Sequence, residues 1–336
     1  MSLIVRSIGP TAAFQDAGRP GHFASGLTRG GAIDTDALAE GAALLGNSSD
    51  CAAVEMAGMG GTFEATAPLR IALTGADMTA RIGDSAATWH ACHAMKAGDV
   101  LTIGAARKGT YGYLHVGGGF DAPQFMGTRG AHMSAGLGRL IEVGDTLAAR
   151  PDPGNRTGLR LPTPDRFDGG TVRIVPSVQT AQFPQDVRQR FEATTFTRDP
   201  RANRQGMRME HEGEGFSAEA QRKIVSEIIV PGDIQITGDG TPFVLMCESQ
   251  TTGGYPRIGT VIPCDLSRVA QCPIGGALRF RFVTLAEAQE AERRARAWRT
   301  ALPSKATPIL RDPAEISDLL SYNFISGAIS AHNEVP

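Results

Sequence analysis

The sequence predicts a mainly β protein with two β-barrel lobes, a few short helices and a helical C-terminal tail. Glycine supplies 41 of the 336 residues and proline supplies 20, and turn-forming residues at this frequency favour many short strands over long helices. Short apolar runs recur between glycine turns on both sides of one proline-rich stretch, which is typical of antiparallel barrels or sandwiches. Apolar residues make up 41% of the chain, so it can bury a sizeable core.

An N-terminal β lobe is expected over residues 1–155. Its first strand is Leu3–Ile8, where apolar and polar residues alternate. The glycine-rich segment Gly9–Gly21 follows as a loop. Further strands are expected where short apolar runs lie between glycine turns: Leu69–Leu73, Val100–Ile103, Tyr111–Val116 and Arg139–Val143.

One helix is expected within this lobe. Asp34 or Thr35 can cap its N-terminus, and Gly46 marks its end. Its apolar residues share one face, as expected of a helix that packs on a sheet: Leu38, Ala42 and Leu45.

The second β lobe is expected over residues 170–285. It follows the linker candidate Arg150–Gly170, which contains prolines at positions 151, 153, 162 and 164. A short helix is expected within Ser177–Phe191. Strands are predicted at Val172–Val175, Phe243–Cys247, Thr260–Ile262 and Leu278–Val283.

Residues 286–336 are expected to form a helical C-terminal extension. Thr284 and Glu287 have the spacing of a capping box, and the helix that they open is predicted to run to about Ala301. A second helix is expected to start at Asp312, with Pro313 in its first turn. It would carry one apolar stripe: Ile316, Leu319, Leu320 and Phe324.

Charge and cysteine content exclude several classes of protein. The net charge of −2 provides no basic footprint for nucleic acid or for an anionic membrane. No apolar stretch has the length of a signal peptide core or of a transmembrane helix. The five cysteines include no C-x-x-C pair, which argues against a disulfide framework and a zinc site. We therefore expect a cytoplasmic protein that binds neither nucleic acid nor membranes.

Two short motifs invite a metal or biotin interpretation. In the run Trp-His-Ala-Cys-His-Ala, His90 and His93 point to opposite faces of a strand, so they cannot bind one metal ion together. Lys96 follows Ala-Met as in biotin-accepting turns, but alanine rather than methionine comes next. We expect Lys96 to lie in an exposed hairpin, and we expect no bound metal and no covalently attached biotin. Phosphate-binding and hydrolase motifs of the P-loop, dinucleotide, zincin and nucleophile-elbow types are absent from the sequence.

The first of three polar segments lies within Gly9–Gly21. Its glycines at 18 and 21 permit positive φ angles and close backbone approach. Asp16 and Arg19 can hold each other, which would make a structural turn, or they can bind a ligand. Both interpretations remain open from spacing alone.

Two further polar segments lie in the second lobe. Gln250–Pro256 places an amide, two hydroxyls and a phenol around two glycines, which is more than a plain turn requires and suits a small polar ligand. Arg198–Met209 carries four arginines around Asn203 and Gly206, and it is either a solvated loop or a source of a guanidinium for an anion.

These segments together resemble the family variously called carboxyltransferase subdomain A and B, allophanate hydrolase subunit 2, KipA-like or 5-oxoprolinase C subunit. The resemblance covers roughly residues 3–286. It rests on an ordered set of motifs: G-x-T-x-x-x-Q-D-x-G-R-x-G from residue 9, LTGADM from residue 73, YLHVGGGFDAPQFMGTRG from residue 113, N-R-x-G-x-R from residue 203 and QTTGGYPRIGTV from residue 250. The chain departs mildly from the family pattern at 30–34, 55–56 and 205.

The resemblance implies cyclophilin-like barrels and a role as the C subunit of an ATP-dependent 5-oxoprolinase, a hydrolase that opens 5-oxo-L-proline to L-glutamate. Its partners would be a KipI-like B subunit together with the A subunit, and the chain alone would be inactive. ATP and Mg²⁺ would act at the level of the complex. Two alternatives remain: a carboxyltransferase component that acts on urea or a related amide, and a KipA-like regulator of a kinase inhibitor. The carboxylase alternative would need a companion half and biotin components, which this chain lacks.

The resemblance and the polar segments together give nine candidate substrate-binding residues and no catalytic residue. Arg19 or Arg204 is expected to bind the substrate carboxylate, and Gln250 with Thr251 the lactam amide. Asp16, Arg19, Arg204 and the segment Gln250–Tyr255 are expected to converge on one cleft. The full set is Asp16, Arg19, Asp34, Asn203, Arg204, Gln250, Thr251, Thr252 and Tyr255.

Overall fold

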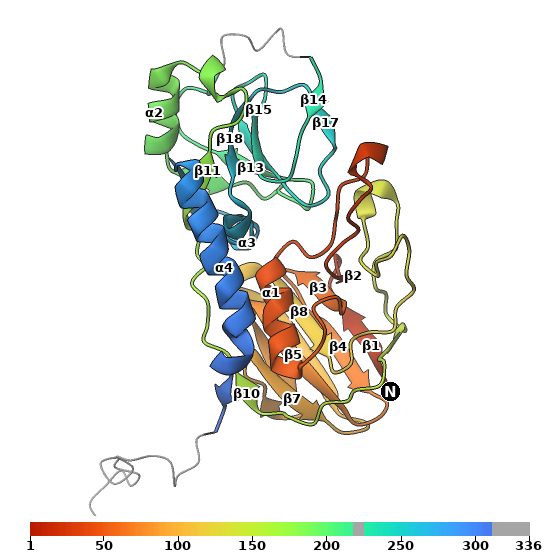
Figure 1. The fold of residues 1–336 in the computed structure, drawn as a ribbon. Helices are drawn as coiled ribbons and strands as arrows, with labels where there is room; N and C mark the ends of the chain where they lie inside the picture. The colour runs from red at the N-terminus through yellow and green to blue at the C-terminus, as the bar shows by residue number, and fades with distance from the viewer. Residues whose placement is uncertain (218–224, 311–336) are drawn as a thin grey trace, which may run out of the picture.

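The computed structural model describes residues 1–217 and 225–310, and it confirms the mainly β fold. Figure 1 shows two bodies of β structure, one above the other, with helix α4 lying along one side of both. The predicted helix from Asp312 onward lies outside the described residues.

The first body is a large sheet, formed mostly by the N-terminal half of the chain. Its main path runs β20-β10-β7-β5-β8-β4-β1-β9, and β2, β3 and β6 pair with it off this path. The strands are β1 (Ser2–Ile8), β2 (Ala13–Gln15), β3 (Ala53–Ala57), β4 (Gly61–Ala65), β5 (Leu69–Ile82), β6 (Ser85–Ala86), β7 (Ala91–Met95), β8 (Val100–Val116), β9 (Thr146–Ala148), β10 (Leu159–Arg160) and β20 (Thr307–Pro308).

The second body is a closed barrel in the order β11-β18-β15-β16-β13-β12-β19, with a two-stranded sheet of β14 and β17 beside it. A cluster of aromatic rings packs against the barrel, in which the rings of Phe191 and Phe280 are stacked with their centroids 5.3 Å apart. The strands are β11 (Gly170–Val175), β12 (Phe196–Arg198), β13 (Gly206–Glu210), β14 (Glu227–Ile228), β15 (Asp233–Ile236), β16 (Pro242–Leu245), β17 (Thr252–Gly253), β18 (Arg257–Val261) and β19 (Ala277–Phe282).

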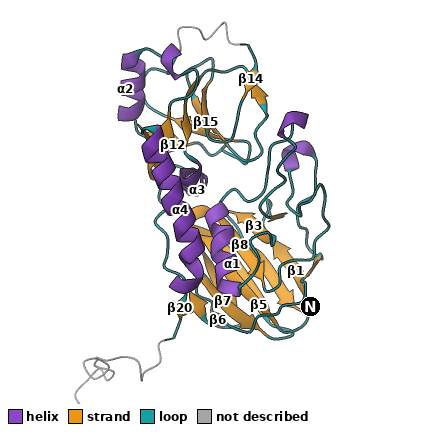
Figure 2. Cartoon of the chain, in the orientation of Figure 1, coloured by secondary structure: helices purple, strands orange, loops and turns teal. Residues whose placement is uncertain are grey.

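The helices lie mainly on the outer faces of the two β bodies, as Figure 2 shows. They are α1 (Thr35–Leu45), α2 (Gln185–Ala193), α3 (Leu266–Gln271) and α4 (Leu285–Lys305), and the short 3-10 turns are η1 (Phe23–Ser25), η2 (Met133–Ala135), η3 (Thr180–Gln182) and η5 (Pro263–Asp265). The predicted starts of α1 and α4 are confirmed. The Asp34 side chain accepts from the backbone at the start of α1, and Thr284 with Glu287 forms the capping box of α4.

Three of the predicted strands differ from the structure. The predicted runs Val100–Ile103 and Tyr111–Val116 belong to one long strand, β8, because the polar stretch between them stays paired with β5 through register shifts. The prediction of a strand at Arg139–Val143 is wrong. Left-handed glycines flank the segment at Gly138 and Gly144, and Arg139 folds back locally onto Asp145 at 2.7 Å.

Helix α1 packs on the first sheet through an unusually close contact. A side chain at Gly41 would meet the His115 ring within 2.4 Å, so only glycine allows the helix to lie against β8 here. His115 is buried, and its Nε2 lies 2.8 Å from the Thr74 hydroxyl. Burial lowers the pKa of His115 to about 3. The imidazole is therefore neutral in the folded protein at neutral pH.

We expect His115→Asn to weaken the acid sensitivity of folding. The unfolded chain binds a proton at this ring below pH 6.5 and the folded chain does not, so the stability that the neutral ring contributes is lost as pH falls from about 6.5 toward 3. The difference in unfolding free energy between wild type and variant should shrink by about 1 kcal/mol between pH about 6.5 and 5.5. Urea titrations of both proteins across this range test this, and a difference that stays constant would contradict it.

Candidate functional site

A cavity of about 550 Å³ lies at the seam between the first sheet and the barrel. The sheet contributes residues of β2, β3 and β8, and the barrel contributes the end of β12 and the segment that follows it. The cavity combines apolar walls with a few convergent polar groups, as small-molecule sites do. The polar side chains in its lining include Gln15, Glu55, Tyr111, Ser134, Arg198, Asn203, Arg204 and Glu248.

Arg204 joins the two bodies at this cavity. Its guanidinium donates to Glu55 of β3, to Glu248 of the barrel at 2.6 Å and to the Gly31 carbonyl at 2.6 Å. Both carboxylates are 3% exposed. Because all three terminal directions of the guanidinium are occupied, Arg204 has no free fork to offer a substrate carboxylate. Arg204 neutralises the two buried carboxylates, Glu55 and Glu248.

Each of the two glutamates has further partners. The second oxygen of Glu55 accepts from the Tyr113 hydroxyl at 2.6 Å and from the Ile33 backbone at 3.0 Å. The second oxygen of Glu248 accepts from the Ser134 backbone at 3.1 Å. The ion pairs with Arg204 are thus embedded in a network that fixes the geometry of the cavity wall.

Asp16 and Arg19 lie next to this site but do not line the cavity. Asp16 accepts from the Thr128 hydroxyl, from the Arg129 backbone at 2.7 Å and from the Gly18 backbone at 2.9 Å. Arg19 is 2% exposed and donates to the Gly130 carbonyl. Burial lowers the pKa of Arg19, while the charges of Asp16 and Glu248 act in the opposite direction.

Asp34 is fully buried and serves the start of α1. Its carboxylate accepts from the Asp36 and Ala37 backbones, each at 3.1 Å, from Arg166 at 2.8 Å and from Gln271 at 2.7 Å. With four donors already bound, this carboxylate has no capacity directed at the cavity. Asp34 is the N-cap that the sequence predicts. It is also one of the two buried carboxylates that pair with Arg166, the other being Glu40.

The predicted residues of the barrel separate into two groups. Asn203 lines the cavity beside Arg204, and its side-chain oxygen accepts from the Gln205 backbone at 2.8 Å. The segment from Gln250 to Tyr255 does not line it. Thr251 is nearly buried, Thr252 lies on β17, and Tyr255 is 48% exposed. Of the nine predicted residues, Asn203 and Arg204 therefore border the cavity directly.

Several cavity residues escaped prediction from sequence. Glu248 immediately precedes the Gln250 segment, and only its position beside that motif points to it. Arg198 opens the arginine-rich segment, which the sequence does mark as a possible guanidinium source. Tyr111 lies in an apolar strand, so its side chain is expected in the core. Its polar end reaches the cavity only because β8 passes beneath the barrel.

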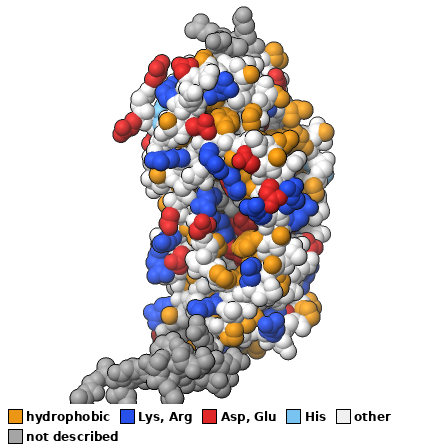
Figure 3. All heavy atoms as spheres, turned by 60° about the vertical axis from the view of Figure 1, so that its left-hand side comes forward, with side chains coloured by type: hydrophobic (Ala, Val, Ile, Leu, Met, Phe, Trp, Pro, Cys, Tyr) orange, Lys and Arg blue, Asp and Glu red, His pale blue; other side chains and the backbone are white. Residues whose placement is uncertain are grey.

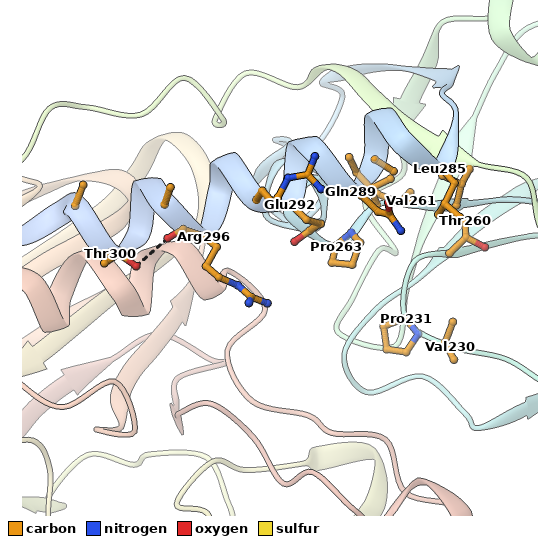
Figure 4. A pocket seen from close by; sticks show the side chains of 16 residues that line it. Val230, Pro231, Thr260, Val261, Pro263, Leu285, Gln289, Glu292, Arg296 and Thr300 are labelled. Carbon is orange, nitrogen blue, oxygen red and sulfur yellow. Dashed lines mark hydrogen bonds between the residues drawn. The ribbon is translucent and has the colours of Figure 1, made fainter.

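A larger groove of about 1060 Å³ runs between α4 and the barrel. Figure 4 shows mainly aliphatic side chains there, such as Leu285, Val261 and Val230, with Arg296 at one end. Figure 3 shows basic, acidic and apolar side chains interspersed over the face that carries α4, without one dominant charged patch. The groove lacks a buried polar cluster, so the smaller cavity at the seam is the better candidate site.

The described residues contain no group of three or more histidine, cysteine, aspartate or glutamate side chains that could hold a metal ion. Within the same part of the chain, no helix is long and apolar enough to cross a membrane. Lys96 is exposed in the turn between β7 and β8, as predicted, and its backbone donates to Asp99 at 2.7 Å.

The chain belongs to the carboxyltransferase domain family, subdomains A and B, which it matches over residues 25–282. It is 33% identical over 298 residues to the C subunit of 5-oxoprolinase from Escherichia coli (strain K12), a match that covers 87% of this chain and 94% of the relative. It is 31% identical over 288 residues to the C subunit of 5-oxoprolinase from Haemophilus influenzae, covering 84% and 92%. The solved structure of Kluyveromyces lactis urea amidolyase has the same fold, with a TM-score of 0.78 and 20% identity over 93% of this chain and 21% of that one.

Proposed function

We propose that this chain is the C subunit of an ATP-dependent 5-oxoprolinase, which converts 5-oxo-L-proline to L-glutamate together with the A and B subunits. The observation that carries the proposal is the match to two 5-oxoprolinase C subunits over more than nine tenths of their length. Urea amidolyase, by contrast, shares the fold at low sequence identity, and this chain spans about a fifth of it. The comparison with the C subunits therefore outweighs the carboxylase alternative.

The cavity at the seam is the proposed substrate site of this chain. A lactam carbonyl is a poor electrophile, so its opening requires stabilisation of charge on the oxygen and a firm hold on the rest of the molecule. Asn203 contacts the ligand in this proposal, and Arg204 holds the wall through Glu55 and Glu248. Asp16, Arg19 and Asp34 position the loops around it.

The partner subunits supply what this chain lacks. The sequence has no phosphate-binding P-loop motif, so we assign the ATP and Mg²⁺ site to the assembled complex, with no covalent biotin. The segment with Gln250, Thr251, Thr252 and Tyr255 contacts the KipI-like B subunit or the substrate at the rim. An interface of more than about 1,000 Å² in total is expected for a stable complex. The complex acts in the cytoplasm.

We expect the isolated chain to release no glutamate from 5-oxoproline, and we expect full turnover only when the A and B subunits, ATP and Mg²⁺ are added. The physical reason is that the cavity presents a binding wall without an evident nucleophile and base pair. The assay measures glutamate released by this chain alone, by this chain with the B subunit, and by all three subunits together. Turnover by the chain alone would refute the need for partners. Turnover of urea with added biotin components, and none of 5-oxoproline, would favour the carboxylase alternative. A shift in kinase-inhibitor activity without any turnover would favour the regulator.

A further inference from the structure

Arg198 is a buried cation with no acidic partner among the described residues. It is 3% exposed and lines the cavity at the seam. Its Nη1 donates to the Thr110 hydroxyl and to the Cys272 carbonyl, each at 2.5 Å. Its Nε has no hydrogen-bond partner in the part of the chain that the structure describes. A buried charge normally requires a counter-charge, because it has lost its hydration.

The nearby acids are committed to other arginines. Asp199, the next residue in the chain, pairs with Arg201 at 2.5 Å. The two cavity glutamates, Glu55 and Glu248, pair with Arg204. The cavity wall therefore contains one guanidinium whose charge nothing in the described chain neutralises.

Two more polar side chains of the same cavity each carry an atom without a hydrogen-bond partner among the described residues. Tyr111 is 4% exposed, and its hydroxyl makes no hydrogen bond within the described chain. Burial raises the pKa of Tyr111 to about 12, so the hydroxyl keeps its proton and remains a donor at neutral pH. Gln15 is fully buried, and its Nε2 donates to the Ala131 carbonyl at 3.1 Å. Its Oε1 is an acceptor to which no described residue donates.

We propose that the seam cavity binds a small carboxylate that also carries an N–H donor, with Arg198 and Tyr111 holding the carboxylate and Gln15 accepting from the N–H. This proposal rests on the proposed function and deepens it, because it assigns the charge of the ligand to a residue. It also discriminates between substrate classes. A cyclic amide with a carboxylate satisfies all three unpaired groups, whereas neutral urea would leave the Arg198 charge without a partner.

The sequence indicates Arg19 or Arg204 as the residue that binds the substrate carboxylate, whereas this proposal assigns that contact to Arg198. Arg204 is occupied by two glutamates and a carbonyl, and Arg19 does not line the cavity. The residue at which an arriving carboxylate gains a charge-assisted hydrogen bond without breaking an existing ion pair is Arg198.

A titration with two matched probes tests the proposal. The probes are 5-oxo-L-proline and its neutral carboxamide, and their affinities are measured by calorimetry on the full chain alone and in the complex with the A and B subunits. Wild type should prefer the acid. Arg198→Met should weaken binding of the acid roughly 10- to 100-fold and leave the carboxamide within about 3-fold. Arg198→Lys should restore part of the preference, because lysine keeps the charge but loses the planar fork.

Tyr111→Phe is a second variant that tests the proposal. It is needed if Arg198→Met disturbs folding through loss of the contacts to Thr110 and Cys272. It removes one oxygen that has no internal hydrogen bond, and it should weaken the acid by roughly 3- to 10-fold without changing the melting temperature. Arg279→Met, at an exposed position of β19, is the matched control and should change neither affinity.

The outcomes separate this inference from the proposed function. Equal binding of acid and carboxamide by wild type, or an equal loss of both in the Arg198 and Tyr111 variants, overturns the inference. Turnover of 5-oxoproline with an unchanged KM in Arg198→Met overturns it as well, while the enzyme assignment stands. A preference for the acid that depends on Arg198, in a complex that releases no glutamate, supports the ligand class and refutes the proposed reaction.

Discussion

Replacement of Arg204 by methionine lowers the free energy of unfolding by about 3–5 kcal/mol in our expectation, the range for breaking a buried ion pair from one side. The guanidinium neutralises Glu55 and Glu248, which lie on different β bodies and are each 3% exposed. Methionine fills much of the volume but leaves two carboxylates without a cation. Urea unfolding of wild type and variant at pH about 7.5 measures the loss.

The triple variant Arg204→Met, Glu55→Gln, Glu248→Gln separates charge from packing. It removes both stranded charges, so it should recover more than half of the lost stability. Arg208→Met is the matched control on β13, because its side chain is 25% exposed and its nearest acid, Asp199, lies at 3.4 Å and keeps Arg201. A loss below about 1 kcal/mol is expected there. Equal losses in Arg204→Met and Arg208→Met would contradict the proposed role of Arg204.

Replacement of Arg166 by methionine is the second large effect. Arg166 lies between the two bodies and donates to both oxygens of Glu40, at 2.7 and 3.0 Å, and to Asp34 at 2.8 Å. All three side chains are buried. The variant should lose about 3–5 kcal/mol of stability at pH about 8, because two carboxylates lose their cation.

The loss in Arg166→Met should depend on pH in a defined direction. Burial raises the pKa of Glu40 to about 7, against the opposing effect of Arg166, and removal of Arg166 raises it further. A group whose pKa is raised by folding gains stability from protonation, so the penalty should be smaller at pH about 5 than at pH about 8. Arg166→Met with Glu40→Gln should lack most of this dependence. A penalty that is the same at both pH values would refute the explanation. Arg268→Met, whose partner Asp165 is almost fully exposed, serves as the mild control.

The elements that the sequence predicts best are those with local signals. The capping side chains of α1 and α4 bind backbone groups within three residues of themselves. Asp34 and Thr284 can therefore be identified as caps from the sequence. Arg139–Val143 has an apolar composition but no partner strand, because the backbone turns at Gly138 and Gly144. A short apolar run does not reveal whether a neighbouring strand will pair with it.

The candidate site is harder to predict from the sequence, because its hydrogen bonds join residues that are far apart in the chain. Arg204 bonds Glu55 across 149 positions, and no spacing rule brings these two residues together. The sequence does mark Asn203 and Arg204 as members of a polar loop. It also marks Asp16 and Arg19, which do not line the cavity. His90 shows the same limit: the sequence predicts it on a strand, yet it precedes β7 with a φ of 53°, is 2% exposed and lies 3.8 Å from Glu40.

The return of the chain at β20 has a mechanical consequence. Two covalent crossings join the bodies, the segment 161–169 and helix α4, and Figure 1 shows both on the same side of the molecule. β20 then fastens the end of α4 to β10, so the second crossing is anchored at both ends. Two connections on one edge restrict rotation of one body against the other about its long axis. They permit a hinge motion about that edge. On the side away from α4, where the loops carrying η1 and η2 lie, the seam is held by hydrogen bonds such as that from the Ser134 backbone to Glu248 at 3.1 Å, so a hinge motion would separate the bodies there.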